Sequence, residues 1–123
     1  MRALVIDDSR TIRIILEGML RTLGFEVDTA VDGSDALSAV TANGTPDLIL
    51  VDWNMPVLNG LGFVEAVRVA PFDVTCPIVM VTTESEIPQI ERALNAGANE
   101  YLMKPFTLDG LTDKLSMLGL VSA

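Results

Sequence analysis

Acidic side chains that suit a hard metal ion or a phosphoryl group follow two short apolar runs in this sequence. Asp7 and Asp8 come directly after the apolar residues 3–6, and Asp52 comes directly after residues 48–51. Carboxylate oxygens are the ligands that Mg²⁺ prefers, and Mg²⁺ commonly uses one or two of them, with water and phosphate completing its octahedron. The three acids are therefore candidates for a site that holds one divalent cation.

Two further polar side chains stand at corresponding points later in the chain. Thr82 follows the apolar run 77–81, and Lys104 follows the run 101–103. Carboxylates that lie together repel one another, so such a cluster needs positive charge nearby. Lys104 supplies one charge, and a bound cation would supply the rest. Helix capping would explain Asp8 alone, because acids are common before a helix N-terminus, but it would not explain the residues at the other strand ends.

The elements that position these residues are five short apolar runs alternating with five segments of helical periodicity. The predicted strands are residues 3–6, 25–30, 48–51, 77–81 and 101–103, and the predicted helices are residues 12–23, 32–43, 59–67, 86–96 and 108–118. Strands without polar alternation belong in a parallel sheet covered on both faces. The alternation indicates an α/β fold with right-handed crossovers. Ligands bind such sheets at the carboxyl ends of the strands, where the candidate residues lie.

Composition limits the class of protein. The 123 residues are 50% hydrophobic and carry a net charge of -9, which fits one acidic domain with a real core. That charge disfavours nucleic acid and anionic membranes as partners, and no stretch approaches the ~18 apolar residues of a membrane helix. The single cysteine, Cys76, cannot form an internal disulfide, so we expect a cytoplasmic protein. Without histidine, histidine-based catalysis and the usual zinc sites are excluded.

Four motifs resemble those of response-regulator receiver domains, most nearly the stand-alone chemotaxis (CheY-like) type. They are VIDDSRTIR, LILVDWNMPVLNG, MVTTES and YLMKPFT, and they span almost the whole chain in the family's order and spacing. The resemblance implies a flavodoxin-like, doubly wound (βα)5 fold with strand order 2-1-3-4-5. It also implies a phosphoacceptor switch of a two-component system, which receives its phosphoryl group from a sensor histidine kinase or a phosphotransfer protein.

The resemblance also implies a role for each matching residue. Asp52 matches the phosphoacceptor, and Asp7 and Asp8 match the acidic pair that binds Mg²⁺ or Mn²⁺, with Asp8 and Asp52 as direct ligands. Further implied roles concern the main-chain carbonyl of Asn54 as a metal ligand, Thr82 and Lys104 as partners of the phosphoryl group, Tyr101 as an aromatic that moves inward with Thr82, and the side chains of Asn54 and Glu84 as groups that tune hydrolysis.

Phosphorylation is expected to reshape the face formed by the fourth helix, the fifth strand and the fifth helix, which would bind an unknown downstream protein. The expected exposed members of this face are Ile87, Ile90, Glu91, Tyr101 and Lys114. The fourth helix begins with Glu86-Ile87-Pro88 rather than the lysine-bearing sequence of flagellar-switch binders, which suggests a different partner. Chemotaxis or motility is the candidate pathway.

Three expectations concern the chain as a whole and one peptide bond. We expect one receiver domain over residues 1–123, with no output domain, acting as a monomer. We also expect a cis peptide between Lys104 and Pro105, because cis costs only ~0.5–1 kcal/mol before proline and the turn must direct Lys104 toward Asp52.

Three other interpretations stay open on the sequence. A phosphatase of the haloacid-dehalogenase kind also uses a strand-end aspartate and Mg²⁺, but it needs a second acid where Asn54 stands. A flavodoxin-like flavin binder needs a donor-rich loop where Asp7 and Asp8 would repel phosphate. A receiver fold that binds proteins without phosphorylation is disfavoured by the complete acidic site. We therefore expect no enzyme activity beyond self-phosphorylation from a phosphodonor and self-dephosphorylation.

Overall fold

The fold is a single parallel sheet between two layers of helices. The structure, a computed structural model, describes residues 1–121 except the side chain of Glu84. Within that part of the chain, five parallel strands pair in the order β2-β1-β3-β4-β5, which confirms the predicted doubly wound, flavodoxin-like order. The strands are β1 (Arg2–Ile6), β2 (Glu26–Ala30), β3 (Leu48–Asp52), β4 (Ile78–Thr82) and β5 (Glu100–Met103).

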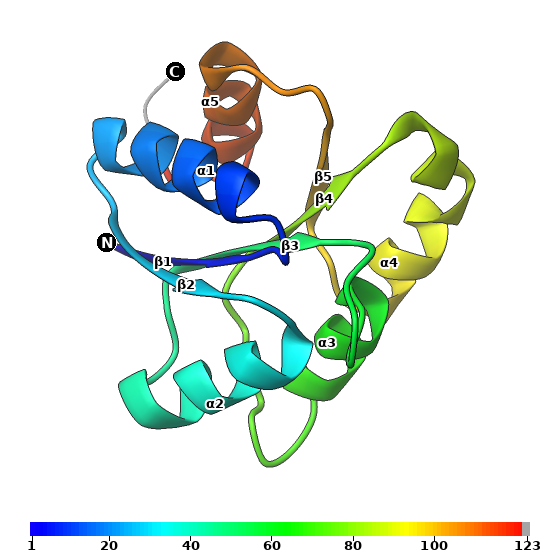
Figure 1. The fold of residues 1–123 in the computed structure, drawn as a ribbon. Coiled ribbons are helices and arrows are strands. Elements are labelled where there is room, and N and C mark those ends of the chain that lie inside the picture. Colours follow the sequence, from blue (N-terminus) through cyan, green and yellow to red (C-terminus); the bar gives the residue numbers. More distant parts are fainter. Residues whose placement is uncertain (122–123) are drawn as a thin grey trace.

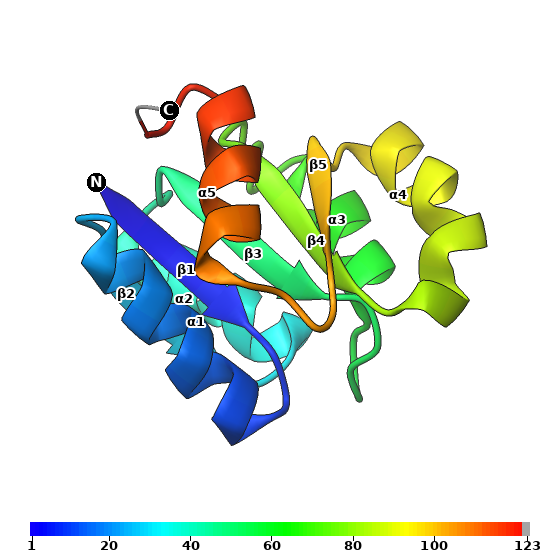
Figure 2. The same ribbon diagram turned by 90° about the horizontal axis from the view of Figure 1, so that it is seen from above.

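The helices cover both faces of this sheet. They are α1 (Arg10–Thr22), α2 (Gly33–Asn43), α3 (Gly60–Val67), the 3-10 helix η1 (Glu84–Gln89), α4 (Ile90–Ala96) and α5 (Leu108–Met117). Figure 1 shows α1 and α5 on one face and α2, α3 and α4 on the other, and Figure 2 shows the same arrangement from above. The sheet is therefore enclosed, as the continuous apolar runs predicted.

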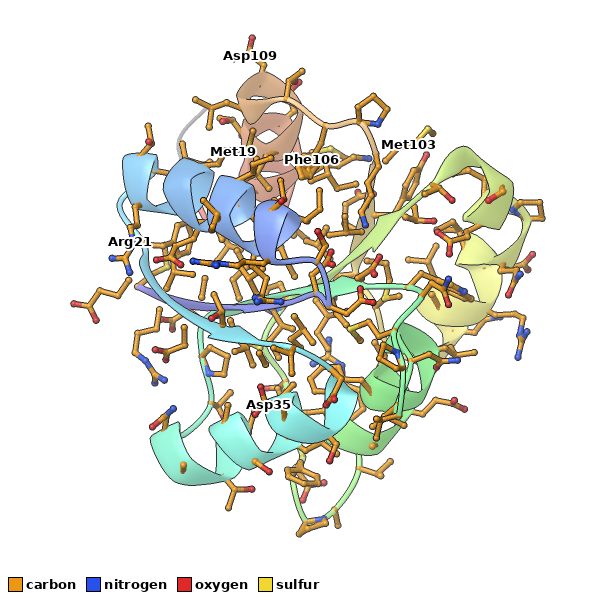
Figure 3. All side chains as sticks on the ribbon, in the orientation of Figure 1. Met19, Arg21, Asp35, Met103, Phe106 and Asp109 are labelled. Carbon is orange, nitrogen blue, oxygen red and sulfur yellow. The ribbon has the colours of Figure 1, made fainter. Side chains whose placement is uncertain are left out.

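Burial of the central strands creates two apolar cores, one on each face. Every residue of β3 and β4 is buried. On the α1 and α5 side, Met19 and Phe106 pack against the same buried cluster, and Figure 3 shows both in the space between these helices. The only polar side chains buried among the described residues are Asp7, Asp52 and Thr82, all at strand ends. The rigid sheet thus carries its buried polar groups at one edge.

The predicted fourth helix is wrong in its first half. Residues Glu84–Gln89 form the 3-10 helix η1, and the α-helix α4 begins only at Ile90. Pro88 lies inside η1, where it has no N–H to donate and its ring would clash with the carbonyl four residues earlier in an α-helix. The expectation that Ile90 is exposed is also wrong, because its side chain is only 8% exposed.

Two proline peptide bonds within residues 1–121 are cis. The Lys104–Pro105 bond is cis, as predicted, and the Ala70–Pro71 bond is a second example that the sequence did not indicate. No helix in this part of the chain has both the length and the apolar character needed to cross a membrane.

Candidate functional site

The carboxyl ends of four neighbouring strands form the candidate site. Asp7 follows β1, Asp52 ends β3, Thr82 ends β4, and Lys104 follows β5. Parallel pairing aligns these ends: Asp52 is in register with Val81, and the main-chain N–H of Lys104 donates to the carbonyl of Thr82 at 2.7 Å. The sheet itself therefore gathers the residues that the sequence placed at separate strand ends.

Three carboxylates meet at this edge. Asp7, Asp8 and Asp52 each present an oxygen, and these atoms lie within 4.8 Å of one another. Asp7 and Asp52 are 1% and 6% exposed, whereas Asp8 is exposed to solvent. A set of hard oxygen donors with one open side is the chemistry that suits Mg²⁺ or Mn²⁺. The residues present therefore fit the cation that the sequence implied.

The first acid of the pair is already held on both oxygens. Oδ1 of Asp7 accepts the main-chain N–H of Ser9 at 2.8 Å, and Oδ2 accepts Nζ of Lys104 at 3.4 Å. Arg13 donates to the main-chain oxygen of Asp7 at 2.8 Å. Ser9, rather than Asp8, caps α1, because its hydroxyl accepts the N–H of Ile12. Both oxygens of Asp7 are therefore hydrogen-bonded within the site, whereas the neighbouring Asp8 is exposed to solvent.

Lys104 provides the positive charge among the acids. Its Nζ lies 3.1 Å from Oδ1 of Asp52 and 3.4 Å from Oδ2 of Asp7. Burial favours loss of its proton, but the hydrogen bonds and attraction to Asp52 and Asp7 together outweigh this and raise the pKa of Lys104. The side chain therefore stays charged, and one ammonium faces two buried carboxylates.

The acids are not fully neutralised by that one ammonium. Burial, followed by repulsion from Asp7, raises the pKa of Asp52 to about 6, although Lys104 opposes the shift. Burial likewise raises the pKa of Asp7. The ionised carboxylates of Asp7 and Asp52 therefore have too little positive charge nearby, and a bound cation would supply it.

The loop after β3 is held against the site by a close approach of α3. A Cβ on Gly60 would collide with the main-chain carbonyl of Asp52 and lie 3.0 Å from Cα of Trp53. The N–H of Gly60 donates to the carbonyl of Trp53 at 3.0 Å. This contact fixes the chain just before Asn54, which is exposed, while Trp53 is buried. Glycine is therefore required where α3 begins.

Thr82 lies at the same edge, and its hydroxyl contacts the segment that follows β4. It is 0% exposed, and its Oγ1 lies 3.2 Å from the carbonyl of Thr83 and 3.2 Å from Oε1 of Glu86. The contact between Glu86 and Thr82 was not predicted from the sequence. The spacing of Thr83 and Glu86 is that of a capping box, and this signal would have located Glu86 at the start of η1.

The two remaining candidates are Tyr101 and Glu84. Tyr101 is half-buried on β5, and Nζ of Lys114 lies 4.4 Å from its ring centroid. Lys114 also pairs with Glu100 at 3.0 Å. The side chain of Glu84, predicted to tune hydrolysis, lies outside the described residues.

Known proteins resemble this chain over nearly its whole length. The profile of the response regulator receiver domain matches residues 3–116. The chain is 41% identical over 119 residues to the chemotaxis protein CheY1 of Helicobacter pylori, with 96% of each chain covered. It is 44% identical over 117 residues to the transcriptional regulatory protein PrrA of Mycobacterium tuberculosis, covering 95% of this chain and 49% of PrrA. The structure of the chemotaxis response regulator CheY4 of Vibrio cholerae matches with a TM-score of 0.85 at 37% identity, covering 95% of this chain and 97% of that one.

The chain therefore belongs to the response regulator receiver domain family. It is a phosphoacceptor signalling switch of the two-component type. Receiver domains are switches rather than conventional enzymes, they bind Mg²⁺ at an acidic pocket, and they receive phosphoryl from a histidine kinase or phosphotransfer partner. In this chain, carboxylate oxygens of Asp7, Asp8 and Asp52 are grouped within 4.8 Å of one another.

Proposed function

We propose that Asp52 is the phosphoacceptor of a single receiver domain spanning residues 1–123. The observation that carries this is a buried carboxylate at the end of β3, 3.1 Å from Nζ of Lys104 and grouped with two further acids. A carboxylate oxygen of Asp52 attacks the phosphorus of the donor, the new O–P bond forms an acyl phosphate, and the bond to the donor's histidine nitrogen breaks. The same site supports self-phosphorylation from small donors and self-dephosphorylation.

The metal site proposed for Mg²⁺ or Mn²⁺ uses Asp8, Asp52 and the main-chain carbonyl of Asn54. Asp8 is exposed beside the cluster, whereas both oxygens of Asp7 accept hydrogen bonds, so Asp7 orients Lys104 and the start of α1. A cation bound there supplies positive charge for the oxygens of the transferred phosphoryl group. Lys104 supplies a second positive charge from the protein itself.

The proposed switch couples the phosphoryl group to the surface of α4, β5 and α5. Thr82 and Lys104 are the groups that would bind phosphoryl oxygens, and Tyr101 would move toward the space that Thr82 leaves. The side chains of Asn54 and Glu84 would tune hydrolysis by positioning or blocking water. The proposed members of the output face are now Ile87, Glu91, Tyr101 and Lys114, since Ile90 is buried; Glu91 is exposed and the other three are half-buried.

Chemotaxis is the proposed pathway, with the protein acting as a cytoplasmic monomer. The support is a match over nearly the full length of a relative named as a chemotaxis protein. The phosphodonor would be a sensor histidine kinase or a phosphotransfer protein, and the downstream target would be a protein that binds the output face.

The experiment that tests this function is acyl-phosphate labelling with acetyl phosphate, with and without Mg²⁺. Wild type should be labelled only with Mg²⁺, and Asp52→Asn should lose the label. Asp113→Asn, an exposed acid on α5, is the matched control and should label normally. Lys104→Ala should still accept a phosphoryl group, but its phosphorylation should not increase its affinity for the downstream partner as it does in wild type. Equal labelling of wild type and Asp52→Asn would disprove the assignment of Asp52.

A further inference from the structure

The carboxylate of Glu86 gathers the polar groups that follow β4. Its Oε1 accepts the main-chain N–H of Thr83 at 2.8 Å and the hydroxyl of Thr83 at 3.0 Å. The same oxygen lies 3.2 Å from Oγ1 of Thr82. One carboxylate oxygen thus joins the last residue of β4 to the first turn of η1.

The hydroxyl of Thr82 depends on acceptors in this turn. Thr82 is 0% exposed, so bulk water does not reach it. Its single proton has two acceptors at 3.2 Å, the carbonyl of Thr83 and Oε1 of Glu86, and both belong to the segment after β4. An ionised acceptor forms a stronger hydrogen bond than a neutral carbonyl. Glu86 is therefore the stronger restraint on the direction of the hydroxyl.

We propose that Glu86 is a positioning residue that holds the Thr82 hydroxyl away from Asp52 in the unphosphorylated protein. This inference rests on the proposed roles of Asp52 and Thr82. A phosphoryl group on Asp52 offers a competing anionic acceptor for the same proton. Because one charged acceptor replaces another, the two positions of Thr82 are closely balanced, and the strength of the Glu86 contact sets how readily Thr82 moves.

The contact also links the acidic site to the output face. When Thr82 turns toward Asp52, Glu86 loses one of the three hydrogen bonds on Oε1 and keeps the two from Thr83. Those two bonds belong to the cap of η1, which leads directly into α4. Glu86 therefore contacts both Thr82 and the first turn of η1. A movement of Thr82 would change the hydrogen bonds of Glu86 and, through them, the turn that leads into α4.

The test variant is Glu86→Gln, which removes the charge and keeps the cap. Glutamine is accepted at this position of a capping box as readily as glutamate, so η1 should remain intact. The probe is beryllofluoride with Mg²⁺, a stable mimic of the phosphoryl group, with binding followed by the fluorescence of the buried Trp53 beside Asp52. We expect Glu86→Gln to bind beryllofluoride about 3- to 10-fold more tightly than wild type, as expected when a charged hydrogen bond becomes a neutral one.

Two controls separate this role from a general effect of charge. Glu65→Gln removes an exposed acid from α3, outside the proposed output face, and should leave the affinity unchanged. In a Thr82→Val background, Glu86→Gln should give no gain, because no hydroxyl is left to release. Glu86→Asp keeps the charge but withdraws the carboxylate by one methylene, and it should also increase affinity. This second variant keeps the test available if Glu86→Gln folds poorly.

The outcomes distinguish the proposal from the function on which it rests. An unchanged affinity in Glu86→Gln and Glu86→Asp would overturn the role of Glu86 while leaving the phosphoacceptor intact. An equal gain in the Thr82→Val background, or in Glu65→Gln, would also overturn it, because the effect would then be simple charge removal. Failure of wild type to bind beryllofluoride, checked by melting temperature, would overturn the proposed function as well.

Discussion

The carboxyl ends of the parallel strands form one edge of the sheet, the carboxyl edge, and their amino ends form the opposite one, the amino edge. Both edges hold partly buried charged side chains, but they balance the charge in opposite ways. At the carboxyl edge, Lys104 faces the carboxylates of Asp7 and Asp52. At the amino edge, the half-buried guanidinium of Arg68 faces neutral oxygens from the segments that precede β4 and β5. The carboxyl edge has excess negative charge, whereas at the amino edge Arg68 has no paired acid among the described residues 1–121.

The amino edge is nevertheless complete as a hydrogen-bonding site. Arg68 donates to the carbonyls of Val74 at 2.8 Å, Cys76 at 2.7 Å and Gly97 at 2.8 Å, and to Oδ1 of Asn99 at 2.9 Å. Burial lowers the pKa of Arg68, but an arginine remains protonated at any pH that the fold survives. No further ligand is needed to satisfy this group.

The difference teaches how to tell a structural charge from a functional one. The guanidinium of Arg68 is fixed by several oxygens that the backbone supplies permanently, and it ties α3 to the starts of two strands. The carboxylates at the other edge are buried with a raised pKa, so part of their charge is uncompensated. A site left unbalanced by the fold is one that a cation and a phosphoryl group can complete.

The largest expected effect tests the amino edge. Arg68→Met keeps much of the apolar stem but removes all the hydrogen bonds to Val74, Cys76, Gly97 and Asn99, so we expect a loss of about 3 kcal/mol in the free energy of unfolding. Urea unfolding measures it, with Arg92→Met on the exposed side of α4 as a control expected to change stability by less than ~0.5 kcal/mol.

Phosphorylation distinguishes the two edges in the same protein. Below its melting temperature, Arg68→Met should still be labelled at Asp52, because Arg68 contributes nothing to the acidic pocket. A variant that kept its stability, or that lost labelling while folded, would contradict the division between a structural edge and a functional edge.

The sequence predicted the carboxyl edge better than the amino edge, for a physical reason. Asp52 and Lys104 directly follow apolar strands, and parallel pairing brings strand ends together whatever the details of packing. The role of Arg68 depends on Gly97, which is 29 residues away, and only the folded chain shows that these carbonyls converge. A single arginine at the end of a helix carries no signal of this.

The errors near α4 have a similar origin. Pro88 prevents the α-helical turn that the prediction assumed at residues 86–89, and this stretch forms the 3-10 helix η1. Ile90 was expected to be exposed because of its place on the output face, not because of its spacing. It is buried together with Ala93, three residues later, as their helical spacing favours. The contact of Glu86 with Thr82 was missed because it depends on this same local turn.

The second prediction concerns the effect of Mg²⁺ binding at the carboxyl edge on stability. A ligand that binds only the folded state stabilises it, by about 2.7 kcal/mol when free ligand is about 100 times Kd. Mg²⁺ should therefore raise the melting temperature of wild type, and Asp8→Asn should lose most of the rise because it removes an exposed ligand. Asp113→Asn and Arg68→Met should keep it. Equal Mg²⁺ responses in Asp8→Asn and wild type would remove Asp8 from the metal site.

The smallest expected effect is on the pH dependence of stability without metal. Burial and Asp7 raise the pKa of Asp52 to about 6, whereas an unfolded aspartate has a pKa of ~3.9. A group whose pKa is raised by folding contributes stability below its unfolded pKa, and this contribution is lost as the pH rises through the folded pKa. Between pH ~4 and pH ~7, wild type in EDTA should therefore lose stability through Asp52.

Asp52→Asn isolates this titration, because an amide resembles the protonated acid and carries no charge to bury. In EDTA, the variant should match wild type near pH ~4 and exceed it by about 1 kcal/mol near pH ~7.5, a value reduced for screening by solvent at the rim of the site. Urea unfolding at the two pH values measures the difference. Lys104 adds no slope in this range, because its pKa is raised further above it. If wild type instead gained stability over Asp52→Asn as the pH rose, Lys104 alone would already neutralise the edge, and the contrast with Arg68 would not hold.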